Sequence, residues 1–195
     1  KMIAIITSVI ILLTPIQASA VTWGDIVDGL RASDTFTSED GETTATRTSE
    51  GEYVISGGQI EELVQVNELQ FSDSLKVLFQ NIGIEQLNAH ADSGKTIVII
   101  LDSDSEVMDG VSVTAHGKDT NLSLTNKGKI GSRDPVNNPG INAGAYDQAQ
   151  AAIKNNGEIT GGMENFVHDE GSRLEFVNDK EGRITDGMHN EAGEK

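Results

Sequence analysis

Residues 157–165 read GEITGGMEN, and residues 182–190 read GRITDGMHN. The second stretch begins 25 residues after the first, and six of its nine positions carry the same amino acid. A recurrence at this distance is typical of solenoid proteins, because one coil cannot bury its own apolar face and must stack on a neighbour. The chain is therefore expected to contain stacked coils.

A looser pattern extends the repeat toward the N-terminus. Two apolar residues at alternate positions lead to an Asn, then after a short gap to Gly-x-Ile, and this pattern fits three times. The third copy carries two extra residues between its Asn and its Gly. The copies are Leu122, Leu124, Asn126, Gly128 and Ile130; Ala151, Ile153, Asn155, Gly157 and Ile159; and Leu174, Phe176, Asn178, Gly182 and Ile184.

Each position of the pattern has a physical interpretation. Apolar residues two apart point to the same face of a strand and predict a buried face. Asn followed two residues later by Gly suits a tight corner, because Asn tolerates left-handed backbone and Gly has no Cβ. Stacking then predicts an apolar row of Ile130, Ile159 and Ile184, and Met163 above Met188. The alternative is a small antiparallel sheet whose turns share Asn-x-Gly, but the match between residues 157–165 and 182–190 favours stacking.

Over about residues 110–195, this pattern resembles the passenger region of bacterial autotransporters and related secreted parallel β-helix adhesins. The resemblance implies an all-β fold with a right-handed parallel β-helix, displayed at a Gram-negative cell surface and associated with the outer membrane. Such passengers leave the cell by a signal peptide and then a carboxy-terminal membrane barrel. The alternating, aromatic-girdled strands of a barrel do not follow the repeats here, so the chain is expected to be a fragment.

The first twenty residues indicate export independently. Lys1 precedes an apolar run from Met2 to Leu13, and the sequence Ala18-Ser19-Ala20 matches a small-x-small cleavage signal. The run is shorter than the roughly 20 residues that a membrane-spanning helix needs. Residues 1–20 are therefore predicted to be a signal peptide, with no membrane span left after its removal. An uncleaved anchor or a buried strand is the alternative.

Composition restricts the partners. The chain has no cysteine, which excludes disulfides and a thiol nucleophile. Its formal net charge of −17 argues against direct binding to nucleic acid or to an anionic membrane. A ligand on a host or neighbouring cell, protein or glycan, is the expected partner.

The region before the repeats, residues 21–109, is expected to be a leader that caps the solenoid and holds its first strands. Val21–Ser56 reads as a polar leader with short strands, one of them at residues 53–55. Residues 59–87 fit either a helix or strands, and strands are favoured. Thr96–Leu101 is the clearest strand of the chain.

Two short motifs suggest chemistry that their context does not support. Ser93-Gly94-Lys95-Thr96 lacks the earlier glycine of a phosphate-binding loop, since that position is Ala89, and a strand follows it instead of a helix. Asp102, Asp104 and Glu106 alternate like calcium ligands, but Val107 occupies the position where a helix-loop-helix calcium site needs Gly. A turn before a core strand and a solvated acidic turn are the preferred interpretations.

Other catalytic or metal-binding patterns are also lacking in the sequence. The four histidines do not have a zinc-binding spacing, and no Gly-x-Ser-x-Gly is present. No catalytic, cofactor-binding or metal-binding residue is therefore predicted, and the chain is expected not to be an enzyme. The histidines are His90, His116, His168 and His189.

Two functional hypotheses follow. The first is a non-catalytic surface adhesin or structural rod that binds through outward side chains and loops, such as residues 131–145. The second is a β-helix polysaccharide lyase or hydrolase, which needs acidic or basic side chains clustered on adjacent coils. The outward repeat positions mix both signs, which favours binding over catalysis; they are Lys127, Lys129, Lys154, Glu158, Glu175 and Arg183. A compact secreted binding domain with a helical N-terminal half is a third hypothesis.

Overall fold

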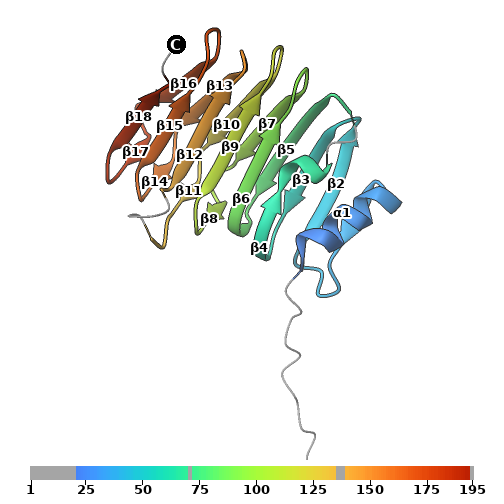
Figure 1. Ribbon diagram of the computed structural model, residues 1–195. Coiled ribbons are helices and arrows are strands. Elements are labelled where there is room, and N and C mark those ends of the chain that lie inside the picture. The colour runs from blue at the N-terminus through green and yellow to red at the C-terminus, as the bar shows by residue number, and fades with distance from the viewer. Residues whose placement is uncertain (1–20, 70–71, 135–138, 194–195) are drawn as a thin grey trace, which may run out of the picture.

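Strands with alternating apolar residues stack in parallel into a solenoid of about six coils (Figure 1). The computed structural model describes residues 21–69, 72–134 and 139–193. The predicted signal peptide at residues 1–20 lies outside these residues. Parallel pairing confirms the expected β-helix in the repeat region, and the antiparallel alternative is wrong there.

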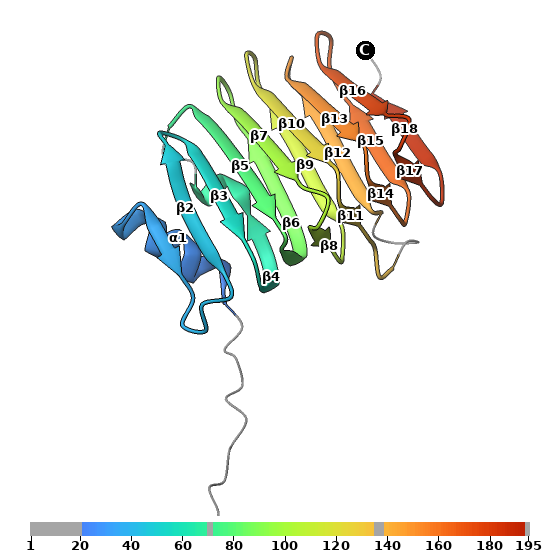
Figure 2. The same cartoon turned by 180° about the vertical axis from the view of Figure 1, so that it is seen from behind.

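The first sheet has eight strands and forms one side of the solenoid (Figure 2). β1, β2 and β3 pair antiparallel, and all later pairings along this sheet are parallel. In spatial order the strands are β1 (Thr35–Thr37), β2 (Thr44–Ser49), β3 (Glu52–Ser56), β5 (Ser74–Gln80), β7 (Thr96–Leu101), β10 (Asn121–Asn126), β13 (Gln150–Asn155) and β16 (Arg173–Asn178).

The second sheet forms the opposite side and one corner. Its long strands pair in parallel and are β4 (Gln59–Gln65), β6 (Gly83–Ala91), β9 (Val111–His116), β12 (Ile141–Tyr146), β15 (Met163–Val167) and β18 (Met188–Ala192). Its short corner strands stack on the start of β6 and are β8 (Glu106–Val107), β11 (Lys129–Ile130), β14 (Glu158–Ile159) and β17 (Arg183–Ile184).

The register of the strands confirms the predicted apolar rows. Ile130 pairs with Ile159 and Ile159 with Ile184, while Met163 pairs with Met188. The three repeat copies also align, from the row of Leu122, Ala151 and Leu174 to the row of Asn126, Asn155 and Asn178. Like residues therefore stack above like residues, as the repeat requires.

The glycines at the Asn-x-Gly corners have a different role from the expected one. Gly128, Gly157 and Gly182 do not have left-handed backbone. Instead, a Cβ on Gly157 would collide with the carbonyl oxygen of Gly128 in the preceding coil. A Cβ on Gly128 would likewise collide with the carbonyl oxygen of Ser105, and a Cβ on Gly182 with that of Asn155. Close approach of successive coils, not turn geometry, requires glycine at these corners.

The corner asparagines also differ from expectation, because they have no left-handed backbone; Asn126 and Asn155 are fully buried, while Asn178 in the last coil is exposed. Nδ2 of Asn126 donates to Oδ1 of Asn155 at 2.8 Å, and Nδ2 of Asn155 donates to Oδ1 of Asn178 at 2.8 Å. Oδ1 of Asn126 accepts the N–H of Gly128, and Oδ1 of Asn155 accepts that of Gly157. We call Asn126, Asn155 and Asn178 the asparagine row. It satisfies buried polar groups at the corners of Asn126 and Asn155.

The expectation of a polar leader with only short strands is wrong at its start, where Trp23–Ala32 form helix α1. Its apolar residues have helical spacing and are buried; they are Trp23, Ile26, Val27 and Leu30. Thr22 caps the helix, since its hydroxyl accepts the N–H of Asp25 and the carboxylate of Asp25 accepts in return from Thr22. Thr-x-x-Asp followed by this spacing is a helix signal that the sequence interpretation missed.

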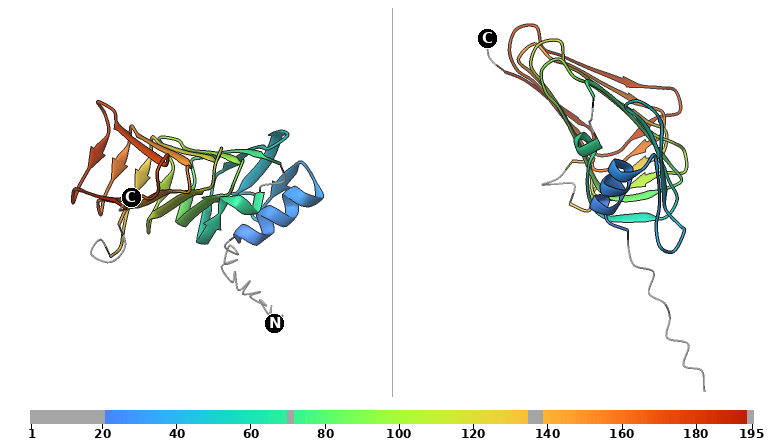
Figure 3. Two further views of the ribbon diagram at one scale, coloured as in Figure 1. Left: turned by 45° about the horizontal axis from the view of Figure 1, so that its top comes forward. Right: turned by 90° about the vertical axis from the view of Figure 1, so that its right-hand side faces the viewer.

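Helix α1 lies across the N-terminal end of the solenoid (Figure 3). It packs against β4, and Nε1 of Trp23 donates to the carbonyl oxygen of Gln65 at 3.1 Å. The helix thereby covers the apolar end of the first coil. It is the element that performs the capping expected of residues 21–109.

Strands are the correct choice for most of residues 59–87, which form β4, β5 and the start of β6 with a short 3-10 turn, η1 (Val66–Leu69). β7 spans Thr96–Leu101 as predicted, and Gly94 in the turn before it has left-handed backbone, with φ +78°.

Parallel pairing begins at β3, and residues 109 and 110 lie between β8 and β9 of one coil. The stack of coils therefore continues across the boundary expected between the capping region, residues 21–109, and the repeat region, residues 110–195.

Helical structure is sparse in the described part of the chain, where α1 and η1 are the helical elements. This finding is incompatible with a compact domain whose N-terminal half is helical. Within the same residues, no helix has the length and apolar character to cross a membrane.

Candidate functional site

Aromatic rings from successive coils form a continuous row on the outer face of the second sheet. His116 ends β9 and pairs with Tyr146, which ends β12. His168 follows β15 and donates its N–H to the carbonyl of Ala145, which places it beside Tyr146 in the next coil. Since side chains alternate along a strand, all three rings project outward from equivalent positions.

The rings are stacked on one another. The His116 and Tyr146 centroids are 4.5 Å apart with planes 10° apart, and the Tyr146 and His168 centroids are 5.1 Å apart with planes 7° apart. His90 on β6 continues the row, with its ring tilted by 51° and its centroid 5.1 Å from that of His116. We call His90, His116, Tyr146 and His168 the ring row. Its spacing matches the roughly 4.8 Å between neighbouring strands.

The ring row is half-buried, and its faces and edges have different surroundings. Both faces of the Tyr146 ring are covered by imidazoles, whereas 42% of the His90 side chain and 38% of the His116 side chain are exposed. A ligand therefore meets ring edges, which carry imidazole nitrogens and the Tyr146 hydroxyl. These edges offer hydrogen bonds at a regular interval along the solenoid.

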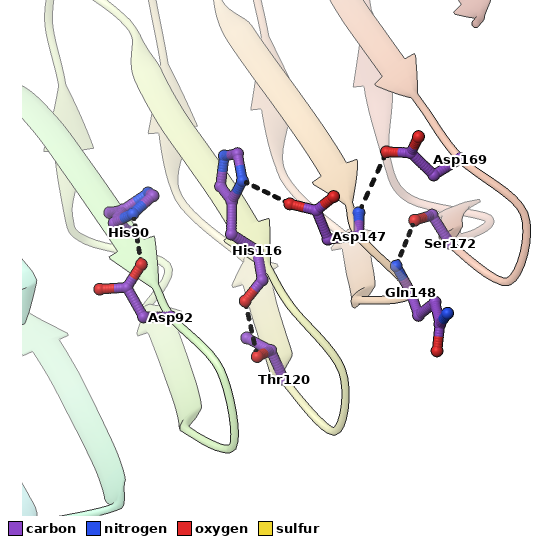
Figure 4. A network of polar contacts seen from close by, with 8 residues as sticks. All are labelled: His90, Asp92, His116, Thr120, Asp147, Gln148, Asp169 and Ser172. Atoms are coloured by element: carbon purple, nitrogen blue, oxygen red, sulfur yellow. Dashed lines mark hydrogen bonds and ion pairs between the residues drawn. The ribbon is translucent and has the colours of Figure 1, made fainter. Parts of the chain in front are cut away.

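Carboxylates lie beside the rings in the turns that lead to the first sheet (Figure 4). Nε2 of His90 is 2.9 Å from Oδ1 of Asp92, and Nδ1 of His116 is 3.7 Å from Oδ2 of Asp147. The N–H of Asp147 donates to Oδ2 of Asp169 in the next coil at 3.3 Å. The turns thus join neighbouring coils as well as positioning the imidazoles.

Backbone geometry explains why Asp recurs in these turns. Asp119, Asp147 and Asp169 all have left-handed backbone, with φ values of 63°, 55° and 73°. Asp is one of the few residues other than Gly that adopts this conformation readily. Gln148 shares it, with φ of 69°, and donates its N–H to the Ser172 hydroxyl at 2.9 Å. Backbone conformation therefore favours Asp at residues 119, 147 and 169 before any ligand is considered.

The first sheet contributes a shallow hollow on the other side of the same turns. It has a volume of about 280 Å³ and forms where the small side chains Ser123 and Ala152 lie between larger polar ones. Asn121 and Gln150 line it from the starts of β10 and β13, and Arg173 lines it from β16. Polar groups thus flank the turns on both sheets.

Thr120, in the turn after His116, uses its hydroxyl to bind the main chain. Thr120, the hydroxyl residue that contacts the main chain of His116, is fully buried and donates to the His116 carbonyl oxygen at 2.8 Å. Its hydroxyl does not meet the imidazole, as a nucleophile and its base must. In the described ranges, no group of three or more His, Asp or Glu side chains is placed to hold a metal ion.

A second polar cluster lies where the 131–145 loop leaves the corner. The Arg133 guanidinium donates to both carboxylate oxygens of Glu85, and the Arg133 N–H donates to Oδ1 of Asp109 at 3.2 Å. The two carboxylates come from neighbouring coils, as in a polysaccharide-cleaving site, but Arg133 engages both. The cluster holds the first part of the loop against the solenoid; residues 135–138 of this loop lie outside the described chain.

The outward repeat residues also do not form a carboxylate pair. Along the corner strands, Glu106, Lys129, Glu158 and Arg183 lie opposite one another in that order. Charge therefore alternates from coil to coil, and opposite charges on adjacent strands stabilise a sheet. This row supports the stack and does not resemble an acid and base pair.

Comparisons with protein-family models, with curated proteins and with solved structures find no match to this chain. The fold and the side-chain geometry therefore carry the functional argument.

The structure brings together three of the four histidines that sequence spacing left separate. His189 lies elsewhere, on β18, where it pairs with Glu164. Asp102 is used inside its own turn, since its Oδ1 accepts the N–H groups of Asn81 and Asp104. The sequence did contain a signal for the ring row, because Tyr146 and His168 each directly precede an Asp.

Proposed function

We propose that this protein is an exported, non-catalytic binding rod displayed at a bacterial cell surface, of the autotransporter passenger type, and that its ring row binds a surface ligand. The observation that carries the proposal is the outward row of His116, Tyr146 and His168, stacked through three consecutive coils. A stiff stack of coils displays such a row as a repeated hydrogen-bonding surface.

A neutral glycan is the ligand class that these groups fit best. Ring nitrogens, a phenol hydroxyl and turn carboxylates supply both donors and acceptors, as sugar hydroxyls require. The net charge of −17 repels anionic chains and does not oppose a neutral one. A protein ligand is the alternative source of polar groups.

Absence of catalysis is part of the proposal and has its own support. Arg133 occupies the carboxylates of Glu85 and Asp109, and the corner row alternates in sign. A glycosidase needs two free carboxyl groups on either side of the scissile bond. The polysaccharide lyase or hydrolase hypothesis is therefore the less supported one.

A glycan array tests the proposal. The wild-type chain is compared with Tyr146→Ala, which removes the central ring, with Tyr146→Phe, which removes only the hydroxyl, and with His189→Ala, a control on the same sheet outside the ring row. We expect binding to neutral glycans that falls at least roughly tenfold in Tyr146→Ala, as for a central aromatic contact. His189→Ala should bind like the wild type. Equal binding by Tyr146→Ala, or shortening of the bound glycans over time, would refute the proposal.

A further inference from the structure

Gly144 occupies an outward position of β12 and is nevertheless buried. Asn142 and Tyr146, two positions before and after it, project outward and are half-exposed, whereas Gly144 has no side chain to cover it. Its backbone does not require glycine, because its φ is not positive. A glycine inside a strand weakens the strand, since it contributes no packing and loses more conformational freedom on folding. Glycine at residue 144 therefore needs a steric explanation.

The side chain of Tyr146 lies over Gly144 and fills the space that a Cβ would occupy. A Cβ on Gly144 would collide with Cε2 of Tyr146, and it would lie 3.0 Å from both Cζ and the hydroxyl oxygen. The phenol thus leans back along β12, with one edge facing the main chain of residue 144. This contact explains why an outward glycine is buried.

The two imidazoles stacked on Tyr146 do not need glycine at the corresponding position. Thr114 precedes His116 by two residues, and Phe166 precedes His168 by two. Thr114 and Phe166 pair with Gly144 from strands β9 and β15, which lie on either side of β12 (Figure 1). Residues two apart on a strand are separated by about 6.6 Å. A phenol, which is longer than an imidazole by a ring carbon and a hydroxyl oxygen, reaches that far.

The orientation of the phenol decides whether the ring row is continuous. The plane of the Tyr146 ring is 10° from that of His116 and 7° from that of His168. A Cβ at residue 144 would force the phenol to rotate about its Cα–Cβ bond into another staggered position. The ring would then leave the space between the two imidazoles, and the row would be interrupted at its centre.

Gly144 also determines where the hydroxyl of Tyr146 lies. The hydroxyl oxygen is above residue 144, which pairs with Thr114 of the preceding coil. Within the described ranges this hydroxyl has no hydrogen-bond partner. A phenol hydroxyl both donates and accepts, so its hydrogen bonds are available to a ligand that reaches the surface of the strand.

From these contacts we infer that Gly144 is a positioning residue of the ring row, because it leaves the space in which the Tyr146 ring stacks between His116 and His168. Glycine at residue 144 and tyrosine at residue 146 form a matched pair. Thr114 and His116 are the other combination, in which a side chain precedes a shorter ring. The role in stacking belongs to the free protein, while its consequence for binding rests on the proposed function.

NMR signals of the imidazole C–H protons in the ligand-free 195-residue chain test the inference. A stacked phenol shifts these signals upfield, and Gly144→Ala should reverse the shift for His116 and His168. Gly83→Ala is the matched control, because Gly83 lies in β6 of the same sheet and a Cβ there meets its nearest atom, Cγ of Gln59, at 3.4 Å. The control should leave both signals in place. Unchanged signals in Gly144→Ala would overturn the inference.

A second substitution tests the pairing of residues 144 and 146 through stability. Gly144→Ala should lower the urea midpoint of unfolding in the wild-type background. In the Tyr146→His background the same change should leave the midpoint unchanged or raise it, because the shorter ring leaves room for a Cβ, as His116 does beside Thr114. An equal loss in both backgrounds would show a general strand defect and would refute the pairing.

Binding measurements separate this inference from the proposed function. On the glycan array, Gly144→Ala should reduce binding to neutral glycans at least roughly tenfold, as Tyr146→Ala does, and Gly83→Ala should bind like the wild type. Undiminished binding by Gly144→Ala would overturn the consequence for binding. A wild-type chain that binds no glycan would refute the proposed function, whereas the NMR and unfolding experiments use no ligand and still decide the role of Gly144.

Discussion

The side chain of Asn126 donates a hydrogen bond to the side chain of Asn155 at 2.8 Å, and both side chains are fully buried. A buried amide has a stabilising role only if its donors and acceptors find partners. Asn126 and Asn155 each serve two coils, because each amide bonds its own corner and the next member of the asparagine row. The row therefore couples neighbouring coils in a way that apolar packing alone does not.

Asn155→Ala is expected to destabilise the protein by about 3 kcal/mol. The change removes the acceptor of the Gly157 N–H and an acceptor of the buried Nδ2 of Asn126, and each buried unpaired group costs roughly 1–3 kcal/mol. Urea unfolding followed by circular dichroism measures the loss. Asn142→Ala is the control, since Asn142 projects outward and is half-exposed; equal losses in both variants would contradict a structural role for the row.

Gly157→Ala and Gly24→Ala should shift stability in opposite directions. The new Cβ at residue 157 meets the carbonyl oxygen of Gly128, so the coils must separate, at a cost of about 1–3 kcal/mol. Gly24 lies in the first turn of α1, and a Cβ there meets its nearest atom, the Thr22 hydroxyl oxygen, at 3.7 Å. Alanine should stabilise that helix by about 0.5–1 kcal/mol. Thermal melts of the two variants measure both shifts in melting temperature. A lower melting temperature for Gly24→Ala than for the wild type would contradict the prediction for helix α1.

Asp25 should make the N-terminal cap sensitive to acid. The Thr22 hydroxyl, followed by the Thr22 N–H, donates to the carboxylate and holds the pKa of Asp25 below its usual value. Because the folded-state pKa is the lower one, the stabilisation is present above the unfolded value of about 3.9 and is lost as the pH falls through the folded value. Asp25→Asn should therefore melt earlier than wild type at pH 7, and the difference should disappear in acid.

Fluorescence of Trp23, the single tryptophan, reports this melting because Trp23 is a buried residue of helix α1 itself. Thr22→Ala provides the second variant. Its free energy of unfolding should fall by about 1 kcal/mol, because the helix loses its N-cap side chain. A difference between wild type and Asp25→Asn that persists unchanged at low pH would rule out the proposed contribution.

Export predicts a mature chain that begins at Val21. Cleavage after Ala20 leaves intact the cap residue Thr22 and the bridge between Val21 and Ile60. Expression of the 195-residue chain in a Gram-negative host, followed by intact-mass measurement of the periplasmic protein, should show the loss of residues 1–20. Ala18→Glu should block this processing, because the cleavage signal needs small side chains; a processed Ala18→Glu chain would place the cleavage site elsewhere.

Local patterns in the sequence determined the coils of this protein. Alternating apolar residues such as Leu122 and Leu124 specify a buried strand face within a few residues, and the recurrence of Gly157–Asn165 at Gly182 specifies stacking. The sequence does not reveal why residue 157 must be glycine, because the carbonyl oxygen that excludes a Cβ there belongs to Gly128 in another coil.

Only the tertiary structure decided which outward side chains meet. His116 and Tyr146 are 30 residues apart and Tyr146 and His168 are 22 apart, yet all three occupy equivalent positions. The intervals differ because the turns and the 131–145 loop differ in length. The number of residues between two rings therefore depends on these lengths and does not reveal that the rings occupy equivalent positions. Stacking distance is set by backbone hydrogen bonds between strands, so rings that sequence spacing separates come within about 5 Å of each other. The coils were thus encoded locally, while the ring row arises from the register of one coil on the next.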